Sequence, residues 1–289
     1  MNMKTALDCI PCLIRQATEA IAMSAGDTVS QADLLRTVLR ELATADWETL
    51  PVCLAQRIHR QIRTATGQSD PYQMLKGVMN RIALDLLPAY ADVIRRQPNE
   101  RDSVVRMAIA GNLLDSGAKT RLAPEALAQR LEEIWETPLI GDVDEFFKAA
   151  EAAQRILYLA DNAGEIVFDR LLIDALPTEK ITVAVRGSPV LNDATLADAK
   201  VAGLPERVPV ISNGSDAPGT LIDDCSVAFR HCFQMSDMNI AKGQGNYECL
   251  CDNHKPIWFL LTVKCPRIAA HIGDPEGSLI VKTQKRKGC

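Results

Sequence analysis

The chain has 289 residues, of which 47% are hydrophobic and 24% charged, an ordinary balance for a globular protein. Its formal net charge of −5 argues against a protein whose main task is to grip nucleic-acid phosphates. No stretch approaches the roughly 18 unbroken apolar residues of a membrane span, and Asp8 and Arg15 interrupt the apolar run that a signal peptide needs. We therefore expect a cytoplasmic protein with neither a nucleic-acid nor a membrane partner.

The first half of the sequence predicts helices. An apolar stripe at helical spacing begins at Leu13, and Ser30 is a predicted N-cap for a second stripe. Asp70-Pro71 predicts the cap and first-turn proline of a third helix. Further helical patterns cover residues 103–114, 124–135 and 144–153.

Short apolar runs alternate with helical stretches after Arg155. The runs cover residues 156–160, 181–185, 208–211, 238–241 and 257–263. Strands separated by roughly 15–25 residues of helix and loop are typical of βαβ units. The sequence therefore predicts an α/β fold: a three-layer, mainly parallel, Rossmann-like sheet with an N-terminal all-helical subdomain.

The boundary between the two parts is placed at Gln97-Pro98-Asn99, where the helical pattern is interrupted. We expect residues 1–98 to form the helical subdomain and residues 99–289 to form an α/β domain that binds metal and phosphate. The helices that follow the boundary can instead cover the sheet.

Polar loops follow the first four apolar runs. These loops are residues 161–165, 186–193, 212–220 and 242–246. In open parallel sheets, ligands bind outside the carboxyl ends of the strands. Any one such loop is more often a turn or a helix cap than a site, but four of them at consecutive strand ends favour a ligand site.

The chemistry of these loops suits a metal ion and a phosphate group. Asp161, Asn162 and Asp193 offer the hard oxygen ligands that Mg²⁺ and Mn²⁺ prefer. Arg186 and Lys242 can neutralise phosphate charge, one as a planar fork and the other as a point charge. We expect Asp161, Asp193 and Lys242 to be catalytic, in a hydrolysis by water that the metal ion activates.

Three motifs carry a resemblance to a known family. They are Asp161-Asn162-Ala163-Gly164-Glu165, Arg186-Gly187-Ser188-Pro189 with Asn192-Asp193-Ala194-Thr195, and Lys242-Gly243-Gln244-Gly245-Asn246-Tyr247-Glu248. Together they resemble the damage-control phosphatases, long labelled domain of unknown function 89. Cys9-x-x-Cys12 followed by Arg15-Gln16 is similar to the subfamily with an N-terminal cysteine pair. Lys264-Cys265-Pro266 also matches, so the resemblance spans nearly the whole chain.

The resemblance implies an activity and a metal centre. Asp161, Asn162 and Asp193 match the metal ligands of the family. Members are phosphatases stimulated by Mn²⁺, Co²⁺, Ni²⁺ or Mg²⁺, and they hydrolyse damaged or side-product phosphate esters, including sugar phosphates. The implied partner is a small phosphorylated metabolite, and no organic cofactor is expected.

Substrate contacts are implied as well. Lys242 matches the lysine that contacts the substrate phosphate, and Asn246 lies in the same loop. With Arg186, these are the expected substrate-binding residues of the α/β half. In the helical half, Arg15 and Asn112 are expected to contribute to substrate binding, with Asp115 beside them.

Two other classes of function compete with the enzyme. The same edge of the sheet can hold a nucleotide or a sugar phosphate in a non-catalytic binding protein. The helical half with its cysteine pair can also be an interaction module for which the α/β half is a scaffold. Turnover of a phosphate ester separates the enzyme from both. The sequence predicts no oligomeric state.

The chain has nine cysteines, an odd number that favours reduced thiols over a disulfide scaffold. Cys9 and Cys12 lie three apart on a predicted helix and hence on one face. They can be a redox pair activated by Lys4 or Arg15. They can also be half of a zinc site that needs two more ligands, for which Cys249 with Cys251 or His254 are the clustered candidates. They can also be packed thiols without a role.

Overall fold

A seven-stranded sheet forms the centre of the computed structural model, which describes residues 3–24, 30–111 and 131–283. The strand order is β1-β7-β6-β5-β2-β3-β4. The strands are β1 (Leu139–Gly141), β2 (Ile156–Leu159), β3 (Ile181–Val185), β4 (Val210–Ser212), β5 (Met238–Lys242), β6 (Ile257–Thr262) and β7 (Leu279–Thr283). Neighbouring strands from β6 to β4 are parallel, whereas β7 is antiparallel to β6. The predicted α/β fold is confirmed.

The five strands with clear apolar runs are the parallel ones, and the sequence predicted all of them within two residues at each end. The two strands that it missed, β1 and β7, lie together at one edge of the sheet. β1 has only three residues, which is too short for a pattern to be recognised. β7 ends in half-buried Lys282 and Thr283, so its apolar run is short as well.

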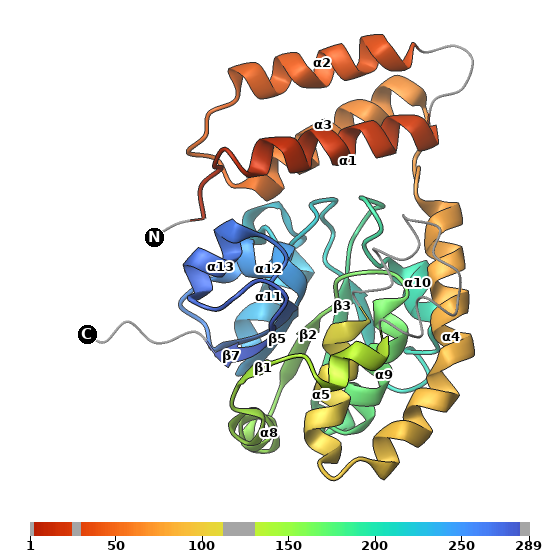
Figure 1. The fold of residues 1–289 in the computed structure, drawn as a ribbon, viewed down its shortest axis with the longest axis vertical. Coiled ribbons are helices and arrows are strands. Elements are labelled where there is room, and N and C mark those ends of the chain that lie inside the picture. Colours follow the sequence, from red (N-terminus) through yellow and green to blue (C-terminus); the bar gives the residue numbers. More distant parts are fainter. Residues whose placement is uncertain (1–2, 25–29, 112–130, 284–289) are drawn as a thin grey trace.

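Helices cover both faces of the sheet because successive strand side chains point to opposite sides. Ile156 and Tyr158 of β2 face one core, and Leu157 and Leu159 face the other. The first core is covered by α4 (Gln73–Arg96), α5 (Glu100–Ala110), α8 (Val143–Ala152), α9 (Glu165–Asp174) and α10 (Leu196–Val201). The second core is covered by α11 (Val227–Met235), α12 (Gly243–Leu250) and α13 (Pro266–Ile272). Figure 1 shows the two sets on either side of the sheet.

The first three helices form a group of their own above the sheet (Figure 1). They are α1 (Cys9–Ser24), α2 (Gln31–Thr44) and α3 (Pro51–Thr66), and their apolar faces enclose a third core. Ser30 is the N-cap of α2, as predicted, since its side chain accepts a hydrogen bond from the backbone of Asp33. None of the described helices is long and apolar enough to cross a membrane.

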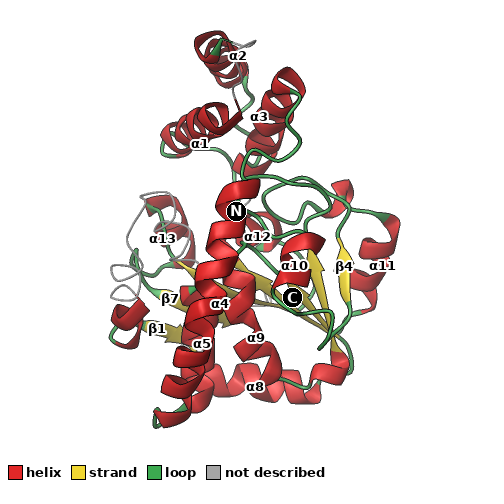
Figure 2. Cartoon of the chain, turned by 90° about the vertical axis from the view of Figure 1, so that its right-hand side faces the viewer, coloured by secondary structure: helices red, strands yellow, loops and turns green. Residues whose placement is uncertain are grey.

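The long helix α4 connects this group to the sheet (Figure 2). It begins at Gln73, so the prediction that Asp70-Pro71 caps it was wrong: Asp70 accepts a hydrogen bond from the backbone of Tyr72, in the turn before the helix. Although α4 lies within residues 1–98, it packs against α9, which covers the sheet. The division at residue 98 stays a prediction.

Hydrogen bonds tie α3 to the loops that follow β3 and β4. Arg60 holds the carboxylate of Asp216 through two nitrogens, and Gln56 donates to the same group at 2.7 Å. Arg63 pairs with Asp216 and donates to the backbone oxygen of Pro189 at 3.0 Å. Burial alone would raise the pKa of Asp216, but these hydrogen bonds and the arginine charges lower it below its usual value.

Substituting Asp216→Asn should lower the free energy of unfolding by roughly 1–3 kcal/mol, because two arginines lose a charged acceptor. Since its pKa is lowered in the folded state, Asp216 stabilises the protein fully above about pH 4, the usual aspartate value. This contribution disappears as the pH falls through the lowered pKa. Urea unfolding at pH 7 measures the effect. Asp92→Asn, at an exposed pair with Arg95, is the control and should change stability by less than about 1 kcal/mol; equal effects would contradict the assignment.

Candidate active site

The candidate site lies where the order of the sheet reverses. From β2 the chain adds β3 and β4 on one side, and it then returns to add β5 and β6 on the other. The carboxyl ends of β2 and β5 therefore border the crevice where ligands bind in such sheets. Asp161 follows β2, and Gly243 follows β5 in a left-handed conformation with φ of 77°. The two are so close that a Cβ atom on Gly243 would overlap Oδ2 of Asp161.

The loop after β3 folds back onto the loop after β2 and brings two carboxylates together. Asn162 and Asp193 form an isolated antiparallel bridge. The backbone N–H of Ala194 donates to the backbone oxygen of Asp161 at 2.8 Å, and that of Ala163 donates to the backbone oxygen of Asn192 at 2.9 Å. These hydrogen bonds hold Asp161, Asn162 and Asp193, the predicted metal ligands, together at the carboxyl ends of the strands. We call this edge of the sheet the rim.

A buried guanidinium faces both carboxylates. Nε of Arg186 lies 2.6 Å from Asp193, and its NH2 lies 3.4 Å from Asp161. Its NH1 donates to Thr220 at 3.3 Å and to the side-chain oxygen of Asn246 at 3.2 Å. Asn246 is itself anchored by donating to the backbone oxygen of Lys242. Arg186 is therefore oriented by four neighbours, and Asn246 acts on it from beneath the rim.

The rim holds more negative than positive charge close to Asp161. Burial raises the pKa of Asp161 well above its usual range, and the carboxylates of Asp193 and Glu165 add to the effect. Arg186 and Lys264 oppose it without cancelling it. A further cation beside Asp161 and Asp193 would relieve this repulsion.

The donor set fits a hard divalent cation. Asp161 and Asp193 supply carboxylates, and Asn162 supplies an amide oxygen that accepts one hydrogen bond from Asn192 at 2.9 Å and has a second lone pair. Within the described residues, no three His, Cys, Asp or Glu side chains converge as a metal cluster. An ion here would thus take two carboxylates and an amide and complete its shell with water or substrate, as Mg²⁺ and Mn²⁺ commonly do.

Lys242 lies beneath the rim, and its side chain is 0% exposed. Its ammonium group donates to Ala108 at 2.9 Å, to Glu165 at 2.7 Å and to Asp169 at 2.5 Å. Burial disfavours its charge, but the two carboxylates more than compensate and raise the pKa of Lys242. Glu165 in turn accepts a hydrogen bond from Asn162 at 3.0 Å. Lys242 thus supports the loop after β2, and its contact with a substrate phosphate stays a prediction.

Lys264 is a cation at the rim that the sequence analysis did not assign. It lies two residues after the end of β6, and its side chain is exposed whereas that of Lys242 is buried. Its charge acts on Asp161, and its backbone N–H donates to Gln244 of α12 at 3.2 Å. The sequence could have predicted this position, because Lys264 directly follows the fifth apolar run, as the polar loops follow the first four.

The predicted substrate contacts from the helical half are less defined. Arg15 is exposed on α1, and the contact that the structure shows for it is with the sulfur of Cys12. Asn112 and Asp115 lie outside the described residues. The substrate-binding roles of Arg15 and Asn112 stay predictions.

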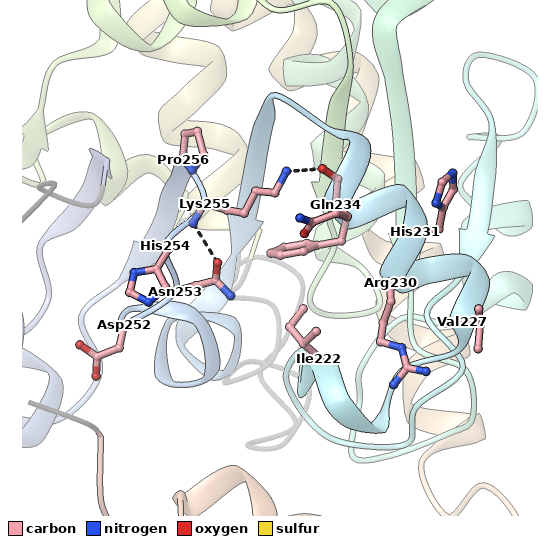
Figure 3. A pocket seen from close by; sticks show the side chains of 11 residues that line it. Ile222, Val227, Arg230, His231, Gln234, Asp252, Asn253, His254, Lys255 and Pro256 are labelled. Atoms are coloured by element: carbon pink, nitrogen blue, oxygen red, sulfur yellow. Dashed lines mark hydrogen bonds between the residues drawn. The ribbon is translucent and has the colours of Figure 1, made fainter.

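A separate surface pocket of about 920 Å³ lies beside α11 (Figure 3). Arg230 and His231 of α11 line it together with His254 and Lys255 from the loop before β6. The ammonium group of Lys255 is held by the backbone oxygens of Gln234 and Ser236. The loop before β6 lies at the amino ends of the strands, so this pocket is not part of the rim.

Comparison with known proteins identifies the family. The chain matches the model of the damage-control phosphatase ARMT1-like domain over residues 5–280, and it belongs to that family. The resemblance seen in the sequence motifs is therefore confirmed.

Relatives share most of their length with this chain. An uncharacterised protein from Methanocaldococcus jannaschii is 33% identical and covers 97% of this chain and 95% of its own. A damage-control phosphatase from Archaeoglobus fulgidus is 34% identical over 79% of this chain and 81% of its own. The crystal structure of a DUF89 family protein from Pyrococcus horikoshii has a TM-score of 0.87 at 30% identity, covering 98% of this chain and 100% of that one.

Substituting Lys242→Met should cost about 3–5 kcal/mol of stability, because it leaves Glu165 and Asp169 buried without their cation. Thermal and urea unfolding measure the loss. Lys282→Met, which breaks a pair with Asp274 at the surface, is the matched control and should cost less than about 1 kcal/mol. Equal stability of the Lys242 and Lys282 variants would show that the Lys242 ion pairs do not support the site.

Proposed function

We propose that this protein is a divalent-metal-dependent phosphatase that hydrolyses small phosphorylated metabolites. The observation that carries the proposal is the pair of buried carboxylates, Asp161 and Asp193, at the point where the sheet order reverses. The names of its relatives support the broader statement that it is a phosphatase of metabolite repair. The donor set supports Mn²⁺, Mg²⁺, Co²⁺ or Ni²⁺ as the ion.

Asp161, Asn162 and Asp193 would hold the ion. When bound, a divalent ion stabilises charge on a phosphoryl oxygen and lowers the pKa of water. The carboxylates contribute more than ligation, because their negative charge keeps the rim selective for cations. Arg186 limits the repulsion between them and fixes their side chains before a substrate arrives.

Several groups favour a phosphate beside these carboxylates. Lys264 is exposed at the rim and offers a positive charge there. The helix α9 begins at Glu165 after the loop that follows β2, and α12 begins at Gly243 directly after β5, so their amino ends add positive potential at the rim. Gly187 packs against the backbone of Gly214, which brings the loops after β3 and β4 into contact.

Arg186 and Lys242 act mainly as positioning residues in this proposal. Arg186 is 2% exposed and holds Asp161 and Asp193, while Lys242 holds Glu165 from below. If Arg186 also binds phosphate, it would do so with the guanidinium that already contacts Asp161 and Asp193. The exposed Lys264 is therefore the stronger candidate for the first contact with a substrate phosphate.

The position of the helical group favours a small substrate. α1 to α3 lie above the sheet, and α3 is bonded to the loops after β3 and β4 (Figure 1). This arrangement covers part of the rim and suits a sugar phosphate or a related metabolite better than a macromolecule. The formal net charge of −5 also disfavours a nucleic-acid substrate.

Phosphate release from para-nitrophenyl phosphate and a panel of sugar phosphates should vanish after chelation and return when a divalent ion is added. Asp161→Asn and Asp193→Asn should each lower kcat/KM by on the order of a hundredfold or more, because each removes a ligand charge. Asp92→Asn is the control and should keep full activity.

Two results would contradict the proposal. Turnover that survives chelation, or full activity in both rim variants, would exclude the assigned ion site. Tight binding of sugar phosphates without turnover under any ion would instead identify a non-catalytic binding protein.

Substituting Gly243→Ala should abolish metal-dependent turnover, because the new Cβ would overlap Oδ2 of Asp161 and the positive φ disfavours alanine. Gly273→Ala is the matched control: its φ is 85°, yet no atom lies within 4 Å of the added Cβ. Both variants carry the backbone strain, and only Gly243→Ala displaces the carboxylate. Equal activity of the two would show that Asp161 does not need its present position.

A further inference from the structure

The Cys9-Ile10-Pro11-Cys12 segment lies outside the phosphatase site, in the first turn of α1. The backbone N–H of Cys9 donates a hydrogen bond to the backbone oxygen of Ala6 at 2.9 Å, just before the helix. Proline is tolerated in a first helical turn, where the backbone N–H has no partner within the helix. Residues three apart on a helix have Cβ atoms about 5–6 Å apart, so a small adjustment brings two thiols to disulfide distance.

Two donors point at the sulfur of Cys12. NH2 of Arg15 and Nε2 of Gln16 each lie 3.6 Å from it. Both side chains are hydrogen-bond donors, so they are placed to contact this sulfur while it reacts. The other candidate activator, Lys4, pairs instead with Glu48. Of the two cations considered from the sequence, Arg15 is therefore the one that contacts the cysteine pair.

Cys9 lies in a different environment, at the contact between α1 and the α/β half. Burial raises the pKa of its thiol, and the charges of Glu248 on α12 and Cys265 add to the effect, while Arg267 opposes it. Burial also raises the pKa of Glu248 to about 7. The raised pKa favours the protonated thiol of Cys9, and the carboxyl group of Glu248 is close enough to contribute to that effect.

A zinc site is not formed by these thiols. No group of three metal-binding His, Cys, Asp or Glu side chains was found in the part of the chain that the structure describes, which includes Cys249, Cys251 and His254. Within the described residues, the two thiols on this helical turn therefore do not belong to a converging set of zinc ligands.

We propose that Cys9 and Cys12 are a thiol–disulfide exchange pair, in which Cys12 attacks a small-molecule disulfide and Cys9 resolves the product. The chemical class of the ligand is a low-molecular-weight disulfide such as oxidised glutathione. This site is independent of the proposed phosphatase activity.

The exchange takes two steps, and each step forms one sulfur–sulfur bond and breaks another. The Cys12 thiolate attacks one sulfur of the disulfide, a bond forms between them, and the other half leaves as a thiolate. Cys9 then loses its proton and attacks the sulfur of Cys12, which releases the second half. The protein loses two electrons and two protons, and the disulfide becomes two thiols. The reverse reaction with a small thiol restores the pair.

The test treats the reduced full-length protein with oxidised glutathione and follows it by intact mass and peptide mapping. The wild type should lose two hydrogens and yield a Cys9–Cys12 disulfide. Cys9→Ser should accumulate a glutathione adduct on Cys12, because the resolving thiol is absent. Cys12→Ser should form an adduct on Cys9 about tenfold more slowly, since the pKa of that half-buried thiol is raised and Arg15 does not contact it. Cys53→Ser, which removes a half-buried thiol elsewhere, should behave as the wild type.

A second variant tests the activation. Arg15→Ala should slow adduct formation on Cys12 in the Cys9→Ser background by roughly threefold to tenfold, with an unchanged unfolding temperature. Three outcomes would overturn the proposal: a disulfide from Cys9 to Cys265, faster modification of Cys9 than of Cys12, or stoichiometric zinc in freshly purified protein. Wild-type thiols that stay reduced under oxidised glutathione would overturn it as well.

Discussion

The contact on which the site depends is the ion pairing of one guanidinium, Arg186, with two buried carboxylates, Asp161 and Asp193. Two like charges buried this close cost free energy unless a cation compensates them. One guanidinium compensates only in part, since the pKa of Asp161 remains raised by burial and by its acidic neighbours. The proposed divalent ion would complete this compensation, and Asn246 and Thr220 hold the Arg186 guanidinium in place.

A second set of buried charges supports the first from below. Lys242 is enclosed with Glu165 and Asp169, and it reaches the backbone of α5 at Ala108. Burial raises the pKa of Asp169 to about 6 even though Lys242 opposes this. The cluster joins β5, α5 and α9 at one point, so the loop after β2 starts from a rigid base. Rigidity of this kind is what the proposed ion site requires of Asp161 and Asn162.

Much of the fold and part of the site could be predicted from the sequence. The parallel strands are apolar throughout, and the polar residues directly after them are therefore visible as rim residues. What could not be predicted depends on distant contacts. The residues around Lys242 in the sequence do not predict its burial against Glu165 and Asp169. Those around Arg60 do not predict its contact with Asp216, which lies 156 residues away. Lys264 was missed because the strand-end rule was applied to the first four apolar runs and not to the fifth, which it follows.

Asp161 and Asp193 are the proposed ligands of a divalent ion. A crystal soaked in Mn²⁺ and measured at the manganese absorption edge tests this assignment most directly, because the anomalous signal locates the ion without reference to activity. We expect the strongest anomalous peak between these two carboxylates, and its loss in Asp193→Asn. A strongest peak elsewhere, for example beside Cys9 and Glu248, with no signal at the rim would contradict it.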